Sequence, residues 1–440
     1  MPRLAFGALA LLLVGCAGPT DEHDPMPTSP QEEAATSLDD VAAEYVRLVL
    51  ALGEHDDGYV DAYYGPAEWR EELRTDTPPL EAILERATAA RRSLPRGGDG
   101  DTSLRVGFLD HQLAALETRV HMLQGETYTF DEESERLYGA VAPTLSEESF
   151  AGRIEELGGM LPGTGDVLPR LEAFRERFTI PPDRLDAVFQ AALTECRKRT
   201  GAHLTLPPGE RFRIEYVTDK PWSGYNWYQG GFESLIQVNT ELPIRLERAV
   251  DLACHEGYPG HHTYNALREW ELVDGKGWIE HTVYPLYSPL SLIAEGSANY
   301  GIDLAFPGEE RARFEAETLA PLAGIDPGAV PEYYRVLDLL DHLSFAGNEA
   351  ARRYLDGEID ASAAAEWLQR YALYAPDRAA QRVRFIDTYR SYVINYNLGK
   401  QIVREWVERG DASSDERWQR FGDLLSSPRL PSDLLADLAP

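Results

Sequence analysis

Apolar side chains recur at helical spacing through most of the chain after residue 36. Ser37, followed by Leu-Asp-Asp, is typical of a helix N-cap with acidic residues in the first turn. Val41, Tyr45 and Val49 then give this helix one apolar face. The same period predicts further helices, separated by Pro- and Gly-containing breaks, at residues 80–94, 104–123, 147–161, 167–178 and 182–199.

The spacing changes from helical to alternating between residues 203 and 240. Residues 212–217 and 232–238 alternate as strands do, and a Gly-flanked aromatic stretch at 222–228 lies between them. We therefore expect a small sheet at about residues 210–240. Helical spacing then returns and predicts helices at residues 243–258, 309–319, 332–353, 362–374, 378–408 and 415–425.

These elements indicate a mainly α fold with one small sheet. A helix-rich stretch of about 400 residues is more than one small hydrophobic core requires. We expect one large, two-lobed helical domain over residues 37–440, with its functional site in a cleft between the lobes.

The first 36 residues have a different pattern. Arg3 precedes an apolar run at residues 4–14, which is too short to span a bilayer and is typical of a secretion signal. The run leads into Leu-Val-Gly-Cys16, which resembles a bacterial lipobox. That resemblance implies cleavage after residue 15 and lipidation of Cys16, and an ordinary secretory peptide cut nearby is the alternative. Residues 16–36, rich in Pro, acidic and hydroxyl side chains, indicate a flexible tether.

Net charge and cysteine content indicate which partners and which cellular compartment the protein has. The chain has 74 acidic side chains and 42 Lys or Arg, a formal net charge of −32, which argues against DNA or RNA as a partner. We expect a protein of the cell envelope, held at a bacterial membrane by its lipid and facing the periplasm or the exterior. Cys196 and Cys254 could pair in such an oxidising compartment. Because Cys254 lies in an apolar helix, a buried free thiol is the expectation for it.

The strongest chemical signal is the stretch from Cys254 to His262, which reads CHEGYPGHH. A His followed at once by Glu is how zinc peptidases place a metal ligand beside a general base, usually as H-E-x-x-H on one helical face. Here position i+4 is Pro259, and the next His, His261, comes at i+6. At about 100° per residue, an unbroken helix would point His261 about 120° away from His255.

The Pro-Gly pair between the histidines removes that obstacle. Pro259 cannot donate a backbone hydrogen bond, and Gly260 tolerates backbone angles that other residues avoid. A helix broken or bulged here would bring His261 to the place of the second His, so we interpret the motif as an expanded H-E-x-x-H. Two alternatives remain. In the first, His262 takes the place of His261 as the second ligand, or lies in the outer shell. In the second, the helix ends before the histidines, which are then exposed to solvent.

Catalytic zinc keeps three protein ligands and one open position. Glu295 is the candidate for the third ligand, because it is an acidic side chain within the small, apolar run at 292–300. Asn299, at i+4, would support Glu295 from the outer shell. The alternative is a surface Glu on an amphipathic helix.

The two motifs together resemble a known signature. The string from His255 to His262, followed by Glu295-Gly-x-Ala-x-Tyr300, resembles a large bacterial family of predicted zinc metallopeptidases with H-E-x-x-P-G-H-H and then E-G-x-A-x-Y, long filed as a domain of unknown function. More distantly, it is similar to helical zinc carboxypeptidases with H-E-x-x-H and a downstream Glu ligand. The resemblance implies a helical zinc peptidase, and residues 395–399 match the family's S-Y-x-x-G element in part.

The residues then predict a mechanism. His255, His261 and Glu295 would hold zinc, which lowers the pKa of water to about 7. Glu256 would take the proton of that water as it attacks a peptide carbonyl, and would pass it to the leaving amine.

Substrate contacts are expected from two regions. Tyr225 and Tyr228 would line a pocket beside an edge strand that pairs with the substrate backbone, with packing inside the small sheet as the alternative. A predicted late helix gathers several basic and aromatic residues, which are Arg382, Arg384, Arg390, Tyr392 and Tyr396. Among these we expect Tyr396 to stabilise the oxyanion and Arg390 to bind a peptide carboxylate.

The sequence thus predicts a membrane-anchored zinc metallopeptidase of short or unfolded peptides. Two other classes stay open. One is a zinc hydrolase of a non-peptide amide or ester, and the other is a peptide-binding lipoprotein without catalysis. Retention of Glu256 argues against the latter, because a binding module needs no base at that position.

Overall fold

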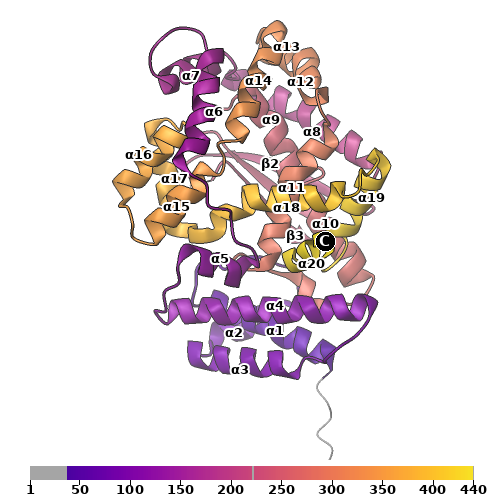
Figure 1. Ribbon diagram of the computed structural model, residues 1–440. Coiled ribbons are helices and arrows are strands. Elements are labelled where there is room, and N and C mark those ends of the chain that lie inside the picture. Colours follow the sequence, from indigo (N-terminus) through magenta and orange to yellow (C-terminus); the bar gives the residue numbers. More distant parts are fainter. Residues whose placement is uncertain (1–36, 221, 440) are drawn as a thin grey trace, which may run out of the picture. The chain divides into compact units, whose positions relative to one another are not determined.

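Helices make up most of the chain from Leu38 onward (Figure 1). The computed structural model describes residues 37–220 and 222–439, and the chain from Ser37 onward clusters as one unit. Two small sheets, of two and three strands, accompany the helices in these residues. The prediction of a mainly α fold with a small sheet is therefore confirmed. The secretion signal, Cys16 and the tether lie outside the described residues.

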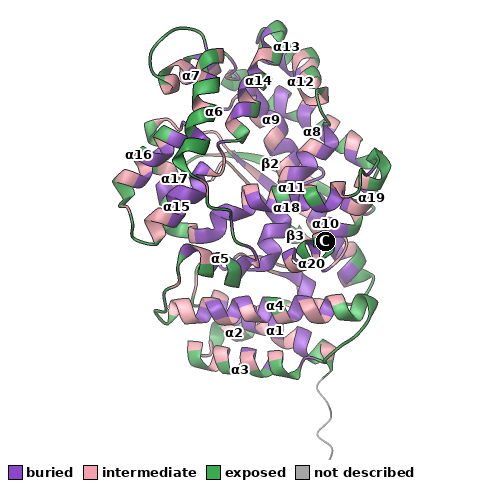
Figure 2. Ribbon diagram, in the orientation of Figure 1, coloured by how far each residue is buried: buried purple, intermediate pink, exposed green. Residues whose placement is uncertain are grey.

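The first four helices pack against one another in the lower part of Figure 1, where they are coloured indigo to purple. They are α1 (Leu38–Gly53), α2 (Ala67–Thr75), α3 (Leu80–Ser93) and α4 (Gly100–Leu123). The side chain of Ser37 accepts from the N–H of Asp40, whose carboxylate accepts from the N–H of Ser37, so the predicted N-cap is a full capping box. Figure 2 shows buried residues alternating with partly buried ones along most of α4.

The C-terminal half contains breaks that helical spacing does not show. The helix predicted at 378–408 consists of α17 (Pro376–Tyr389), a short 3₁₀ turn η7 (Arg390–Val393) and α18 (Ile394–Glu408). Arg390 has a φ of +52°, outside the helical region, and it ends α17. The helix predicted at 332–353 is likewise two helices, α14 (Val330–Asp341) and α15 (Ala346–Leu355).

One strand lies where only helices were expected. Strand β1 (Val60–Tyr63) pairs antiparallel with β5 (Val283–Pro285), so this strand depends on a partner far along the chain. Three short helices were also missed, namely α2, α5 (Phe130–Tyr138) and α20 (Pro431–Leu438). The other helices around the site are α6 (Glu147–Met160), α7 (Val167–Glu176), α8 (Leu185–Gly201), α12 (Glu310–Phe314), α13 (Ala320–Ala323), α16 (Ala361–Tyr371) and α19 (Ser414–Leu425).

The predicted sheet at about 210–240 is present and has three strands. Strand β2 (Arg211–Val217) is parallel to β4 (Glu233–Asn239), and β3 (Gly224–Gly230) is antiparallel to β4. The order β2-β4-β3 makes β3 an edge strand of this sheet. Its backbone is therefore open to pairing on one side.

Helices α11 (Pro289–Ala305) and α18 pack against each other with their backbones unusually close. A Cβ on Gly296 would lie 2.5 Å from the carbonyl of Gly399, which no larger residue could tolerate. Gly296 directly follows Glu295, and Gly399 ends the partly matched C-terminal element. The two glycines thus bring the tyrosines of the C-terminal segment next to Glu295.

Candidate metal centre

The histidine motif runs through three backbone segments. Helix α9 (Leu246–Leu252) continues into a π-helical turn, η2 (Ala253–Gly257), and the chain restarts as α10 (His261–Arg268). The N–H of Gly260 donates to the carbonyl of Cys254 at 2.9 Å, and a Cβ on Gly260 would lie 1.9 Å from the carbonyl oxygen of His255. The helix is therefore bulged and broken as the Pro-Gly pair predicts, and the break requires glycine.

The break brings three potential ligands together. The Nε2 atoms of His255 and His261 lie 3.1 Å apart. From α11, Glu295 Oε2 lies 3.3 Å from Nε2 of His255 and 3.8 Å from Nε2 of His261. This Oε2 is buried and accepts no hydrogen bond of good geometry among the described residues. Two nitrogens and one oxygen thus converge on one point, all within 4.8 Å of one another.

The pKa values of His261 and Glu256 are shifted in directions that suit a metal ligand and a general base, respectively. Burial, helped by the charge of His255, lowers the pKa of His261 to about 4, so its ring is neutral near pH 7. Burial raises the pKa of Glu256 to about 7, with the charge of Glu295 adding to the rise and that of His255 opposing it. A carboxyl group with a pKa near neutrality is suited to general-base work.

Edge strand β3 lies directly beside Glu256. The side chain of Asn226 donates to the backbone carbonyl of Glu256 at 2.7 Å. A Cβ on Gly224 would lie 2.7 Å from Glu256 Oε1, so only a glycine lets the strand approach the carboxylate this closely. The strand, the base and the ligand cluster therefore form one site.

His262 faces away from this site. Its Nδ1 lies 2.8 Å from Ser234 Oγ, and its Nε2 lies 3.0 Å from Glu210 Oε2. The ring is fully buried. Both nitrogens are occupied, so the alternative in which His262 is the second ligand is wrong in this structure.

The side chain that contacts the carboxylate of Glu295 is Tyr392, not Asn299 as expected. The hydroxyl of Tyr392 donates to Glu295 Oε1 at 2.8 Å. Tyr396 lies beside Tyr392, with ring centroids 5.8 Å apart, and lines the cavity described below. Asn299 donates to the backbone carbonyl of Glu295 at 2.9 Å, not to its carboxylate, so Asn299 does not orient the ligand as expected. Tyr392 holds that position instead.

The cluster opens into a cavity of about 2300 Å³. His255, Glu256, His261 and Glu295 line it, and so does Tyr225. Such a volume exceeds the roughly 300–1,000 Å³ of a typical small-molecule pocket. It leaves room for an extended substrate several residues long.

Two expected substrate contacts are wrong. Tyr228 is buried, packs with Ala62 and Ala266, and donates to Glu269, so it does not line the cavity. It is part of the packing below the sheet, which was the alternative.

Arg390 is likewise turned away from the cavity. Its Nε lies 2.7 Å from Glu133 Oε2, and this ion pair fixes the turn between α17 and α18. The φ that breaks the late helix points its side chain away from the cavity wall.

Asp61 on β1 is a cavity residue that sequence reasoning missed. The hydroxyl of Tyr225 donates to Asp61 Oδ1. Burial raises the pKa of Asp61 to about 6, although the hydrogen bond from Tyr225 opposes the rise and Glu295 adds to it. The residues around Asp61 follow no strong pattern, and only the pairing of β1 with β5 places it here.

A disulfide holds the metal turn, contrary to the expected free thiol. Cys196 on α8 is bonded to Cys254 on η2, with Cα atoms 5.7 Å apart and a separation of 58 positions in sequence. The sequence offered two cysteines but not the packing of α8 on η2 that brings them together.

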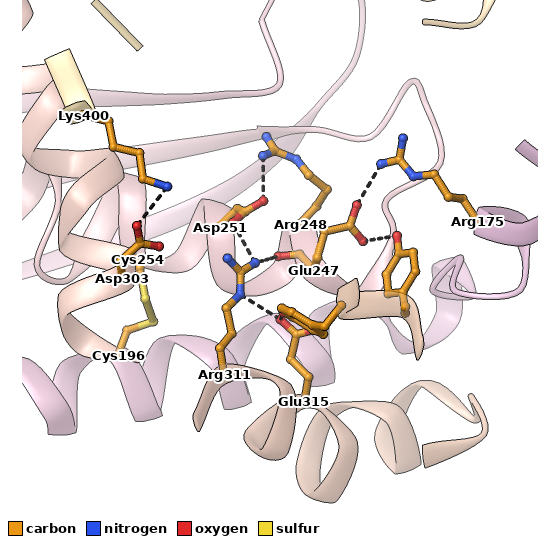
Figure 3. Close-up of polar contacts among 12 residues, drawn as sticks. Arg175, Cys196, Glu247, Arg248, Asp251, Cys254, Asp303, Arg311, Glu315 and Lys400 are labelled. Atoms are coloured by element: carbon orange, nitrogen blue, oxygen red, sulfur yellow. Dashed lines mark hydrogen bonds and ion pairs between the residues drawn. A yellow bond between two sulfur atoms is a disulfide. The ribbon is translucent and has the colours of Figure 1, made fainter. Parts of the chain in front are cut away.

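Ion pairs fix α9 in front of the turn (Figure 3). Arg175 binds Glu247 at 3.0 Å. Arg311 binds Asp251 at 2.7 Å and Glu315 at 3.2 Å. These contacts anchor α9, which leads into the turn that carries His255, to neighbouring elements.

None of the helices in the described part of the chain is long and apolar enough to cross a membrane. No family model matches the chain, and no curated protein matches it. The fold is similar to that of a candidate lipoprotein from Colwellia psychrerythraea, with 15% identity over 84% of this chain and 68% of that one and a TM-score of 0.51. A candidate lipoprotein of unknown function from Shewanella oneidensis aligns over 91% and 82% of the two chains, with 12% identity and a TM-score of 0.44. At these identities the first likeness shows the fold alone, and the family that the motifs resemble stays a prediction.

Proposed function

We propose that the protein is a zinc-dependent peptidase of the bacterial cell envelope. One observation carries the proposal: His255, His261 and Glu295 converge on one point, with the carboxyl group of Glu256 beside them. Two histidines, a glutamate and an adjacent glutamate base are the set that zinc peptidases use.

The residues fit a zinc ion on their own chemistry. Two imidazole nitrogens and one carboxylate oxygen are a common catalytic zinc donor set. The buried Glu295 Oε2 has no hydrogen-bond donor of good geometry among the described residues, which is costly unless a cation neutralises it. A bound zinc ion would supply Lewis acidity, lowering the pKa of water and polarising a carbonyl.

The protein's own groups then have distinct tasks. Glu256 would accept a proton from the attacking water on its carboxylate and return it to the leaving amine. Tyr392 would hold Glu295 in place through Oε1, which leaves Oε2 for the metal. Tyr396, which lines the cavity, would donate a hydrogen bond from its hydroxyl to a developing oxyanion.

Two features favour a peptide over a small amide or ester. The open edge of β3 lies beside Glu256 and offers backbone groups to an extended substrate. The cavity of about 2300 Å³ is larger than a small acyl compound requires.

An envelope location is part of the proposal. A disulfide between Cys196 and Cys254 fits an oxidising compartment. The lipobox at Cys16 and the lipoprotein assignment of the similar Colwellia psychrerythraea structure point the same way.

The test is zinc content and peptide hydrolysis of the purified protein beside Glu256→Gln. We expect about one zinc per chain in both proteins, cleavage of a peptide library by the parent, and a rate about 10²- to 10⁴-fold lower for Glu256→Gln. A parent that binds zinc but leaves every peptide intact is not a peptidase. If it then cleaves a panel of small esters or amides, the non-peptide hydrolase takes its place.

A further inference from the structure

Most basic side chains around the metal helix are neutralised by carboxylates. Arg175, Arg248 and Arg311 line the cavity, and each binds an acidic partner at 2.7–3.0 Å. Lys400 binds Asp303 at 3.0 Å on the same wall. Figure 3 shows the three arginines joined to one another through Glu247 and Asp251, with the pair of Lys400 and Asp303 separate from them. These cations are held by the fold itself.

Two arginines on α17 are different. Arg378 and Arg382 are one turn apart, line the cavity, and have no carboxylate within ion-pair distance in the part of the chain that the structure describes. Arg382 Nε is buried and donates no hydrogen bond there. Arg378 is exposed and Arg382 is partly buried, so both guanidinium groups are open to an anion that enters the cavity.

Aromatic rings hold this pair and link it to the ligand cluster. The guanidinium of Arg382 lies 4.7 Å from the ring of Phe385 and 5.8 Å from the ring of Tyr396. Tyr396 in turn packs on Tyr392, whose hydroxyl binds Glu295. Arg382 is thus two aromatic side chains away from the proposed metal ligand, on the wall of the same cavity.

Resting on the proposed function, we infer that Arg378 and Arg382 bind a carboxylate of the peptide substrate and so select the peptides that this site takes. Arginine binds carboxylates through two parallel hydrogen bonds, and two guanidinium groups at helical spacing present their donors to one anion. The carboxylate comes either from the free C-terminus of the peptide or from an acidic side chain. Both sources present the same carboxylate group to the two arginines.

The test is binding, measured separately from catalysis. Full-length Glu256→Gln protein, loaded with zinc, is titrated by calorimetry with tri-alanine, with tri-alanine amide, and with Ala-Glu-Ala amide. We expect at least one carboxylate-bearing peptide to bind about 10- to 100-fold more tightly than tri-alanine amide, the usual gain from charge-assisted hydrogen bonds. Tri-alanine as the tight ligand identifies the C-terminus, and Ala-Glu-Ala amide identifies an acidic side chain.

Variants of the two arginines locate the effect. Arg378→Gln and Arg382→Gln should each remove most of this preference and leave binding of tri-alanine amide unchanged. Arg382→Lys should retain part of it, since lysine keeps the charge but not the paired geometry. The matched control is Arg384→Gln on the exposed side of the same helix, which should bind as the parent does.

Three results would overturn the inference. Equal binding of all three peptides removes the carboxylate preference. A preference that survives both Gln variants places the receptor elsewhere, and an equal loss of acid and amide binding makes the arginines structural. All three results come from binding measurements on a protein that does not cleave the peptides. The proposed function is tested separately, by zinc-dependent peptide cleavage by the parent protein.

Discussion

Two neighbouring histidines at the start of α10 have opposite surroundings. His261 turns one ring nitrogen toward His255 and Glu295, and within the described part of the chain Glu295 Oε2 accepts no hydrogen bond of good geometry. His262, the next residue, has both nitrogens engaged, by Ser234 and Glu210, and is fully buried. One side of the turn is left open for a ligand, and the other is closed by hydrogen bonds.

The difference separates function from stability within one helical turn. Buried polar groups in proteins are almost always hydrogen-bonded, and a group without a partner requires an explanation. Glu210 binds His262, Tyr258 and Arg197, so the closed side is a complete network that fixes the direction of α10. That fixed direction is what aims His261 at the cavity.

The largest expected effect comes from exchanging each histidine for alanine. His261→Ala should lower zinc content from about one per chain to near zero while the protein stays folded, because it removes one of three ligands. His262→Ala should keep the metal but lose roughly 2–4 kcal/mol of folding stability, since Glu210 and Ser234 each lose a buried partner. Metal analysis and denaturant unfolding, both on the two variants, check this.

Other results would contradict the assignment of His261 to the metal and of His262 to stability. If His262→Ala lost its zinc at full stability, the second ligand would be His262. If both variants lost zinc and stability together, the two sides of the turn would form one unit.

The next effect concerns the disulfide that joins η2, the turn that carries His255, to α8. Replacing Cys196 and Cys254 by serine should destabilise the protein by on the order of 4 kcal/mol, the chain-entropy value for a loop of 58 residues. Zinc content at 25 °C should stay near one per chain, since the ligand cluster consists of His255, His261 and Glu295 and includes neither cysteine. Thermal unfolding with and without a reducing agent measures the loss, and the serine variant should no longer respond to the reductant.

Much of this arrangement could be predicted from local sequence. The Pro259-Gly260 pair indicated the break, and the isolated acidic residue in an apolar helix indicated Glu295. Helical spacing gave most helices within a few residues. These features are local, because they depend on a residue's neighbours within one turn or one strand.

What could not be predicted depends on distant contacts. The sequence left His262 open as an alternative to His261, and only the distant Ser234 and Glu210 distinguish the two. Asp61 reaches the site through a strand that pairs across the chain, and Arg390 leaves it because one residue adopts a positive φ. Tyr392, not Tyr396, touches Glu295, and the close approach of Gly296 and Gly399 determines which tyrosine reaches it.

A smaller effect is expected on zinc affinity when Tyr392, which contacts Glu295, is changed. Tyr392→Phe removes the hydroxyl that binds Glu295 Oε1 and should weaken zinc binding about 10- to 100-fold, the usual cost of losing such a supporting contact. Tyr396→Phe is the matched control. It should leave zinc affinity unchanged and lower the rate of peptide cleavage instead. Competition with a zinc chelator measures the affinities, and equal affinities for Tyr392→Phe and the parent would show that Glu295 needs no support.

The smallest effect is a pH dependence on the closed side. Burial opposes ionisation of Glu210, but hydrogen bonds from His262, Tyr258 and Arg197 lower its pKa from the ordinary 4.5 to about 2. A depressed folded-state pKa contributes stability above pH 4.5, and that contribution is lost as pH falls toward 2. In metal-free protein, the free energy of unfolding should therefore fall less steeply over this window for Glu210→Gln, by at most about 1.4 kcal/mol per pH unit. Urea unfolding at several pH values, with the exposed Glu81→Gln as a control that keeps the parent slope, decides whether the closed side is held by an ionised carboxylate.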